Sequence, residues 1–230
     1  MNNVIVLAKV EKKTVSEKGS ALNVSMKKLF GEGQNFINVI CYDDVKKEVD
    51  ATVSEGSFVV AEGRLQSRNF EKDGKRKYVT ELIANRVVVV DGDNIPSVNT
   101  VSLTGRLTRD PDVRYSSESK AVAHYTLAVD KKDGADFIDM TTFGKSAEFI
   151  EKYIKKGTKI EITGQISSGS YEKDGEKIYT TGVITNTVNF AESKKSSGGS
   201  SSSEPAPESA GSYGAGFDPS SIDDDDLPFN

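Results

Sequence analysis

The sequence is poor in the residue types on which several kinds of chemistry depend. It contains no tryptophan, one cysteine and one histidine. A lone cysteine, Cys41, forms no internal disulfide and fits a reducing compartment. Because there is neither a His/Cys cluster for zinc nor a glycine-rich phosphate loop, we expect no metal, no cofactor and no catalytic residue. His124 and Cys41 are predicted to be structural, and the protein is predicted not to be an enzyme.

Long apolar runs are missing as well, and basic residues are missing from the C-terminal segment. No run reaches the length of a membrane span, and the N-terminus lacks a secretion signal, so we expect a cytoplasmic protein. Residues 1–93 carry 15 basic and 14 acidic side chains, and residues 94–195 carry the same numbers. Residues 196–230 carry seven acidic side chains and no basic one. The acidity is therefore confined to the tail, and the remainder of the chain is faintly basic.

The chain contains two copies of one pattern. Residues Glu71–Gly74 recur unchanged as Glu172–Gly175, an offset of 101 positions, and near the start of each copy the offset is 97. Repeats of about 95 residues predict duplicated globular domains, because solenoid units are shorter. We expect domains at 1–93 and 98–192, the first copy being the more divergent.

Each copy reads as strands around one helix. In the second copy a helix is predicted to begin at Ser146 and to end at Gly157. A hairpin is predicted to turn at Asp174-Gly175. A split ferredoxin-like sheet would need two helices per copy. The predicted fold class is therefore all-β, with two tandem five-stranded oligonucleotide/oligosaccharide-binding (OB) barrels, each with one short helix.

Period-two alternation separates a core face from an outer face along these strands. In residues 137–143, Ile138 and Met140 predict the inward row, which leaves Phe137 and Phe143 on the outer face. In the first copy, the inward row is Ile37, Val39 and Cys41, with Phe36 and Tyr42 outside. A later strand has Val59, Ala61, Gly63 and Leu65 inward, and Arg64, Arg68 and Phe70 outward. Tyr171 is the counterpart of Phe70.

Rings among cations at equivalent places in both copies are typical of surfaces that stack unpaired bases while cations follow the phosphates. Two alternatives stay open: the rings cover a small core or a subunit interface, or the barrels form a scaffold for a protein or structured RNA. The predicted DNA-binding residues are Phe36, Tyr42, Arg64, Arg68, Phe70, Arg76, Arg106, Arg109, Arg114, Phe137, Phe143, Lys145, Tyr171 and Lys173.

One stretch of the second copy, Leu103–Tyr115, resembles the opening signature of bacterial and phage single-stranded DNA-binding proteins. Ala121–Ala123, Phe143–Lys145 and Tyr171 continue the resemblance in order. The resemblance implies tandem OB barrels that protect single-stranded DNA in replication, recombination and repair near the nucleoid, with Phe137, Phe143 and Tyr171 as base-stacking residues. It also implies a homodimer presenting four barrels. The first copy lacks the Asp-Pro-Asp-Val-Arg-Tyr and Phe-Gly-Lys signatures, and the chain lacks the tryptophans usual at two stacking positions.

The tail, residues 193–230, is predicted to be disordered because its Ser/Gly/Pro-rich composition provides little apolar surface to bury. It ends in an acidic tip, residues 223–230, in which an acidic run precedes an apolar plug. By the family resemblance, this tip recruits replication and repair enzymes, although Asn230 follows the usual terminal phenylalanine. The predicted partner-binding residues are Asp223, Asp224, Asp225, Asp226, Leu227, Pro228 and Phe229.

Overall fold

The computed structural model describes residues 1–27, 33–72, 75–91, 98–117, 119–173 and 176–192. The Asp174-Gly175 turn and the tail with its tip lie outside these residues. The described elements, in chain order, are β1 (Asn2–Val15), β2 (Ser20–Lys27), β3 (Gln34–Cys41), α1 (Asp43–Thr52), β4 (Phe58–Lys72), β5 (Lys75–Val90), β6 (Asn99–Leu107), β7 (Asp112–Tyr115), β8 (Ala121–Lys131), β9 (Gly134–Phe143), α2 (Gly144–Tyr153), β10 (Lys159–Lys173) and β11 (Glu176–Phe190).

The first barrel is closed by strand β1, which pairs antiparallel with both β2 and β4. From there the sheet continues β2–β3 and β4–β5, and a short parallel pairing of Val39 and Ile40 with Leu82 and Ile83 joins β3 to β5. Helix α1 fills the connection between β3 and β4. This strand order with one helix is that of an OB barrel.

The second barrel repeats this topology. Strand β6 pairs with both β8 and β10, and β9 pairs in parallel with β11 around Met140 and Val183. Strand β7 is an addition beside β8. Helix α2 again lies between the third and fourth barrel strands. The prediction of two tandem barrels is confirmed.

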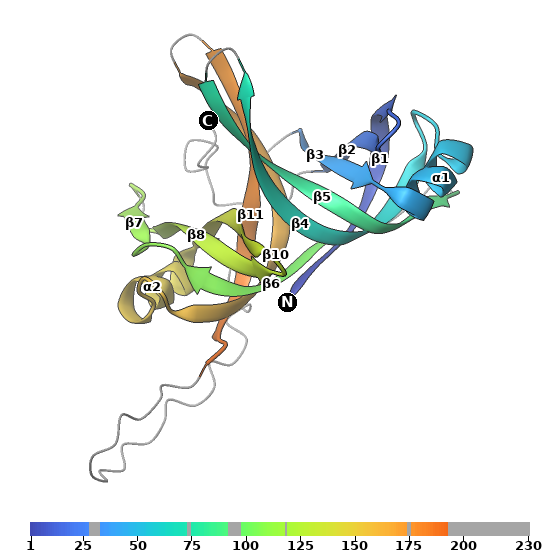
Figure 1. Cartoon of the computed structure of the whole chain (residues 1–230). Coiled ribbons are helices and arrows are strands. Elements are labelled where there is room, and N and C mark those ends of the chain that lie inside the picture. Colours follow the sequence, from blue (N-terminus) through green and yellow to red (C-terminus); the bar gives the residue numbers. More distant parts are fainter. Residues whose placement is uncertain (28–32, 73–74, 92–97, 118, 174–175, 193–230) are drawn as a thin grey trace.

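The two barrels share one continuous sheet. Strands β1 and β6 pair antiparallel from Asn2↔Leu103 to Val6↔Asn99, which makes a single sheet of eleven strands (Figure 1). The β4–β5 and β10–β11 hairpins project beyond the barrels in the same view. Because the joining strands belong to the barrel walls, the barrels are in direct contact.

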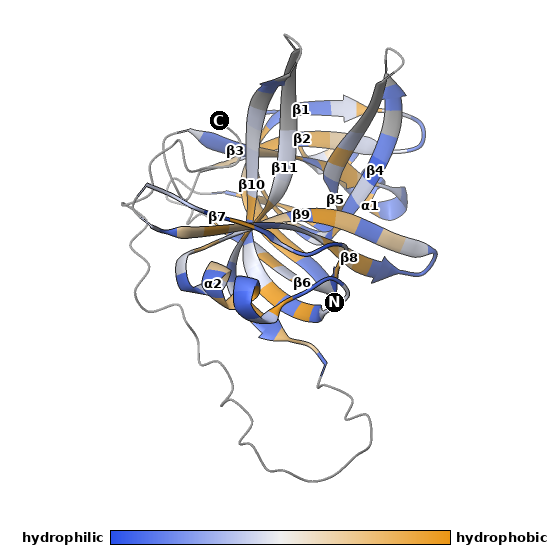
Figure 2. Cartoon of the chain, turned by 90° about the vertical axis from the view of Figure 1, so that its left-hand side faces the viewer, coloured by the Kyte–Doolittle hydropathy of each residue, from blue (hydrophilic) through white to orange (hydrophobic). Residues whose placement is uncertain are grey.

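Side chains that point into the barrels are apolar and buried, as the alternation predicts. Val39 and Leu65 in the first barrel, and Ile138 in the second, are at most 1% exposed. Figure 2 shows hydrophobic residues concentrated in the barrel strands, whereas the projecting hairpins are coloured from pale to blue. Burial of these rows supplies the main favourable free energy of folding.

Both barrels have a bulge beside an equivalent glycine, in addition to a register shift between Val10 and Lys12 in the β1–β2 pairing. The β4–β5 register shifts between Glu62 and Gly63, and the β10–β11 register shifts at the equivalent Gly164. A Cβ on Gly63 would lie 2.0 Å from the carbonyl oxygen of Ile83, so only glycine fits this close approach. The extra residue lies in β5, and the inward–outward alternation predicted for β4 therefore continues through the bulge.

The predicted ends of the second helix are wrong. Helix α2 starts at Gly144, with Phe143 as its N-cap and without a side-chain cap, and it ends at Tyr153 with Ile154 as C-cap. Ser146 therefore lies inside the first turn, and Gly157 belongs to the following turn. Strand β9 is followed directly by the helix. Gly144 has a φ of +58°, and this left-handed conformation changes the direction of the chain between strand and helix.

Candidate nucleic-acid interface

The outer row of β9 places aromatic rings at two ends of a polar strip. Phe137 is 55% exposed and Phe143 is half-buried, with Asp139 and Thr141 between them on the same side of the strand. Thr126 of β8 donates a hydrogen bond to Asp139 at 2.8 Å. At about 3.3 Å per residue, the two rings are rooted roughly 20 Å apart. The predicted outer row is confirmed at the exposed Phe137 and Asp139, whereas Thr141 in the same row is buried.

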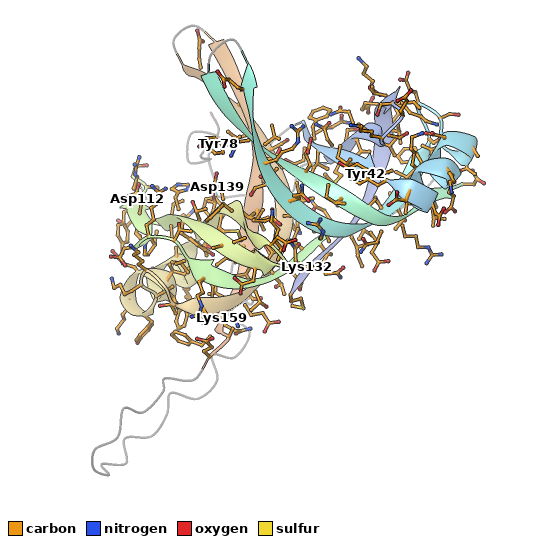
Figure 3. The ribbon with its side chains drawn as sticks, viewed as in Figure 1. Tyr42, Tyr78, Asp112, Lys132, Asp139 and Lys159 are labelled. Carbon is orange, nitrogen blue, oxygen red and sulfur yellow. The ribbon has the colours of Figure 1, made fainter. Side chains whose placement is uncertain are left out.

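The outer row of β3 has the same arrangement in the first barrel. Phe36 is 43% exposed and Tyr42 is 45% exposed, with Asn38 between them. Asn38 accepts a hydrogen bond from the side chain of Asn23 on β2 at 3.0 Å. Both barrels therefore present rings on either side of a hydrogen-bonded polar strip. Figure 3 shows Tyr42 at the start of α1 on the first barrel, and Asp139 on the second.

The strand register aligns one cation with each exposed phenylalanine. One row of directly paired residues crosses the second barrel, from Arg106 on β6 through Ala128 on β8 to Phe137 on β9. Across β1, β2 and β3, the matching row is Lys9, Ser25 and Phe36. Lys9 is a candidate that the sequence analysis missed. The offset of 97 between Lys9 and Arg106 is the signal that points to it.

Several predicted DNA-binding arginines are held by carboxylates. Arg68 donates two hydrogen bonds to Glu81, at 2.7 and 2.9 Å, while Glu81 is only 4% exposed. This pairing, with a smaller contribution from Tyr42, raises the pKa of Arg68. Arg106 pairs with Glu192, Arg114 with Asp112 and Arg64 with Asp136.

Two of these ion pairs also lower the pKa of the carboxylate partner. The hydrogen bond from Arg114 lowers the pKa of Asp112, and the hydrogen bond from Arg106 lowers the pKa of Glu192. Arg68 is thus held against a buried carboxylate, whereas the pairs of Arg106 and Arg114 are exposed to solvent and hold the arginine only weakly. A phosphate that approaches Arg68 or Arg114 competes with a carboxylate already in place.

Arg109 and Lys145 differ from these paired arginines. Both are exposed, and neither forms an ion pair with another residue of the described ranges. Lys145 follows Phe143 and Gly144 at the start of α2. They are the predicted cations whose charge is least compensated within the described structure.

Four predicted residues have side chains that the structure does not describe. The backbone places Phe70 in β4 opposite Lys77, and Tyr171 in β10 opposite Ile178. The side chains of Phe70, Arg76, Tyr171 and Lys173 lie outside the described part. The partner-binding residues 223–229 lie outside it as well.

Tyr78 is an exposed ring that the sequence analysis did not single out. It lies on β5 opposite Asn69 and is 70% exposed (Figure 3). The same offset of 101 pairs it with Tyr179 in the second copy, so the repeat carries the signal. Tyr78 therefore joins the candidate rings of the first barrel.

Cysteine and histidine often act as nucleophile or base in enzymes, but the surroundings of Cys41 and His124 do not favour these roles. Cys41 is fully buried, and burial raises the pKa of its thiol to about 11, which keeps it protonated at neutral pH. Burial also lowers the pKa of His124, which contacts Thr141 at 3.3 Å. Within the described ranges, no group of three or more His, Cys, Asp or Glu side chains is arranged to hold a metal ion.

Two closed five-stranded barrels, each with one helix between its third and fourth strands, define a tandem OB-fold protein. The family model described as "Single-strand binding protein family" matches residues 2–90 and 98–191. The chain belongs to this family. Both copies match, including the divergent first one.

Relatives and solved structures agree with this assignment. A single-stranded DNA-binding protein of Clostridium perfringens is 40% identical over 150 residues, which cover 57% of this chain and all of the relative. The single-stranded DNA-binding protein B of Bacillus subtilis is 41% identical, over 42% of this chain and 92% of its own length. The names of these relatives describe binding proteins and no enzymatic activity.

The crystal structure of wild-type single-stranded DNA-binding protein from Thermus aquaticus has the same fold. It superposes with a TM-score of 0.68 at 21% identity, covering 86% of this chain and 97% of that one. Among the described residues, neither helix has the length and apolar character that a membrane-spanning helix needs.

Proposed function

We propose that this protein binds single-stranded DNA with little sequence preference, by stacking bases on the exposed rings of the outer rows of β3 and β9. The observation that carries the proposal is the repeated placement of rings on equivalent outer rows of two OB barrels, the exposed Phe36 and Tyr42 in the first and the exposed Phe137 with the half-buried Phe143 in the second. An exposed ring offers a stacking surface for any base, and the contact does not read base identity. Family membership and the names of the relatives support the same ligand.

Cations beside the rings are proposed to follow the phosphates. We assign this role to Arg109 and Lys145 first, and to the carboxylate-held arginines second. Because phosphate contacts release counterions, affinity should fall as salt rises. Each barrel should cover roughly 4–16 nucleotides.

The test is a titration of labelled poly(dT) against a duplex of equal length, with wild-type protein and two alanine variants. Phe137→Ala removes a ring from the proposed face and should weaken single-strand binding by on the order of 1–3 kcal/mol. Phe190→Ala is the matched control, because that ring is 50% exposed but contacts Phe149 of α2. Equal affinity for duplex and single strand would contradict the proposal and favour the scaffold alternative.

We further propose that the functional unit is a homodimer with four barrels, supported by the family resemblance and the two barrels in each chain. Light scattering at moderate salt measures the mass. A mass near the 24.9 kDa of one chain rules the dimer out.

We also propose that the protein acts in DNA replication, recombination and repair, and that residues 223–229 recruit the enzymes involved. The support is the sequence of the tip, where four aspartates can steer a basic partner while Pro228 and Phe229 offer apolar surface for a pocket.

A further inference from the structure

The junction between the barrels contains two backbone amides that have side-chain acceptors on the opposite barrel. The amide of Phe137 on β9 donates to the hydroxyl of Ser67 on β4 at 2.7 Å. The amide of Phe36 on β3 donates to the hydroxyl of Ser168 on β10, also at 2.7 Å. Ser67 and Ser168 differ by the repeat offset of 101, as do Phe36 and Phe137.

Each serine is bound back to the residue that precedes its phenylalanine. The amide of Ser67 donates to the carboxylate of Asp136 at 3.1 Å, and the amide of Ser168 donates to the side chain of Asn35 at 2.9 Å. Asp136 and Asn35 are both buried. We call each pair of hydrogen bonds a serine clasp, the first made by Ser67 with residues 136–137 and the second by Ser168 with residues 35–36.

The clasps bind the segments around Phe36 and Phe137. Within its own barrel, each of these segments has a neighbouring strand on one side only. Strand β5 pairs with β3 only at Val39 and Ile40, and β11 pairs with β9 only at residues 140–142. Phe36 and Phe137 lie before these short pairings, so the side of their backbone away from β2 or β8 faces the other barrel. Neither amide has a strand partner on this side, and the serine hydroxyl supplies its hydrogen-bond acceptor.

We propose that Ser67 and Ser168 are positioning residues for single-strand binding, each holding an exposed phenylalanine of the opposite barrel in the orientation that stacks a base. This inference rests on the proposed function. The direction of a side chain follows from the backbone at its Cα, and a clasp fixes that backbone before the ligand arrives. Affinity then rises because less ordering remains to be done on binding.

The two clasps differ in charge. Asp136 also pairs with Lys131 at 2.8 Å and with Arg64 at 3.6 Å, whereas the equivalent Asn35 is neutral. Hydrogen bonds to an ionised acceptor are shorter and stronger than neutral ones. The Ser67–Asp136 bond, at 3.1 Å, is nevertheless longer than the neutral Ser168–Asn35 bond, at 2.9 Å, so the charge does not make the first clasp the shorter one.

The first readout needs no DNA. In Ser67→Ala the hydroxyl acceptor is lost, and hydrogen exchange measured by NMR should accelerate at the Phe137 amide while the Phe36 amide keeps its rate. Ser168→Ala should give the reverse pattern. If exchange at the paired phenylalanine stays unchanged in both variants, the clasps do not hold these amides and the inference is overturned.

The second readout is a pair of double-mutant cycles in single-strand affinity. Ser67→Ala alone should weaken poly(dT) binding about 2- to 10-fold, the range expected for one hydrogen bond. In the Phe137→Ala background the same change should have no further effect, because Ser67 acts through that ring. In the Phe36→Ala background its full effect should remain. Ser168→Ala should show the opposite dependence on the two rings.

The outcomes separate this inference from the proposed function. If wild-type protein does not prefer the single strand, or if Phe137→Ala binds normally, the proposed function fails. If Phe137→Ala weakens binding but Ser67→Ala costs the same factor with and without that ring, stacking stands and the positioning role is overturned. Thermal melting of each variant identifies a loss of affinity that comes from unfolding, and Ser168→Ala supplies the independent second case.

Discussion

Arg64 of β4 and Asp136 of β9 form an ion pair across the junction of the two barrels, with Nη1 and Oδ2 3.6 Å apart. Asp136 is fully buried and also forms an ion pair with Lys131 of its own barrel. At the related position of the first barrel stands Asn35, and the counterpart of Arg64 is Gln165. The junction is therefore symmetric in its backbone contacts and asymmetric in its charge.

Changing Asp136 to asparagine should separate the charge of this residue from its shape. The amide keeps an oxygen for the Ser67 N–H, but Lys131 and Arg64 both lose their carboxylate. We expect the free energy of unfolding to fall by about 1–3 kcal/mol. Single-strand affinity should rise with a steeper salt dependence, because two cations are released near Phe137. Denaturant unfolding and salt-dependent titration measure the two effects.

Asp139→Asn is the control for this change. It removes the same charge from β9, but Asp139 is exposed on the outer row and accepts only one described hydrogen bond, from Thr126. Its stability should stay within about 0.5 kcal/mol of wild type. If both variants lose stability equally, the buried charge of Asp136 contributes no more to the free energy of unfolding than the exposed charge of Asp139.

Arg68 and Arg109 should respond differently to alanine substitution. Arg68→Ala leaves the nearly buried Glu81 without its two hydrogen bonds, so stability should fall by about 1–3 kcal/mol. Arg109→Ala should leave stability unchanged and reduce the slope of log affinity against log salt by about 1, as one lost phosphate contact does. Adding Glu81→Gln to Arg68→Ala should recover part of the stability. An unchanged salt slope in Arg109→Ala would remove it from the proposed interface.

Tyr78→Ala tests the ring that the sequence analysis passed over. If the exposed ring of Tyr78 stacks a base, binding to poly(dT) should weaken by on the order of 1–3 kcal/mol without a change in melting temperature. Tyr153→Ala is the control, since that ring is also exposed but lies on α2 against Phe149. Equal affinities for the two variants would exclude Tyr78 from the interface.

The sequence was sufficient to predict the elements that depend on local pattern. The alternation of Ile138 and Met140 with Phe137 placed these three residues on the correct faces, because burial of one strand face is a period-two property. The repeat offset predicted two barrels, and the single helix per copy excluded the two-helix alternative. Even the bulge at Gly63 left the β4 row intact, since the extra residue lies in the partner strand.

Features that depend on contacts distant in sequence were not predictable. Arg68 reads as a free surface cation, yet its partner Glu81 comes from a neighbouring strand 13 positions away. The serine clasps join residues about 70 and 130 positions apart, and a serine in a strand gives no sign of such a partner. The start of α2 was misplaced because Ser146 has the residue type of a cap, whereas Gly144 supplies the left-handed backbone that begins the helix.

The backbone at the start of each helix leads to a graded prediction. Gly144 has a φ of +58°, and the equivalent Asp43 has a φ of +50°. Gly144→Ala should destabilise the protein by about 1–2 kcal/mol, the cost of a Cβ in this conformation. Gly144→Asp should cost less, because aspartate visits the left-handed region more readily. Denaturant unfolding ranks the three proteins, and equal losses for Ala and Asp would contradict this explanation.

The tip of the tail should act on partner enzymes and only weakly on DNA. Deleting residues 223–230 should leave single-strand affinity equal or slightly higher, because tethered acidic charges compete with DNA for the same cations and that competition fades at high salt. Phe229→Ala should abolish most partner capture, since burial of the apolar plug requires its ring. Phe217→Ala is the matched control in the same tail, outside the tip. Removing Asn230 places the carboxylate on Phe229 and should tighten capture if a partner grips that group. A pull-down from host extract in which full-length, Phe229→Ala and tip-deleted proteins recover the same partners would show that the tip recruits none of them.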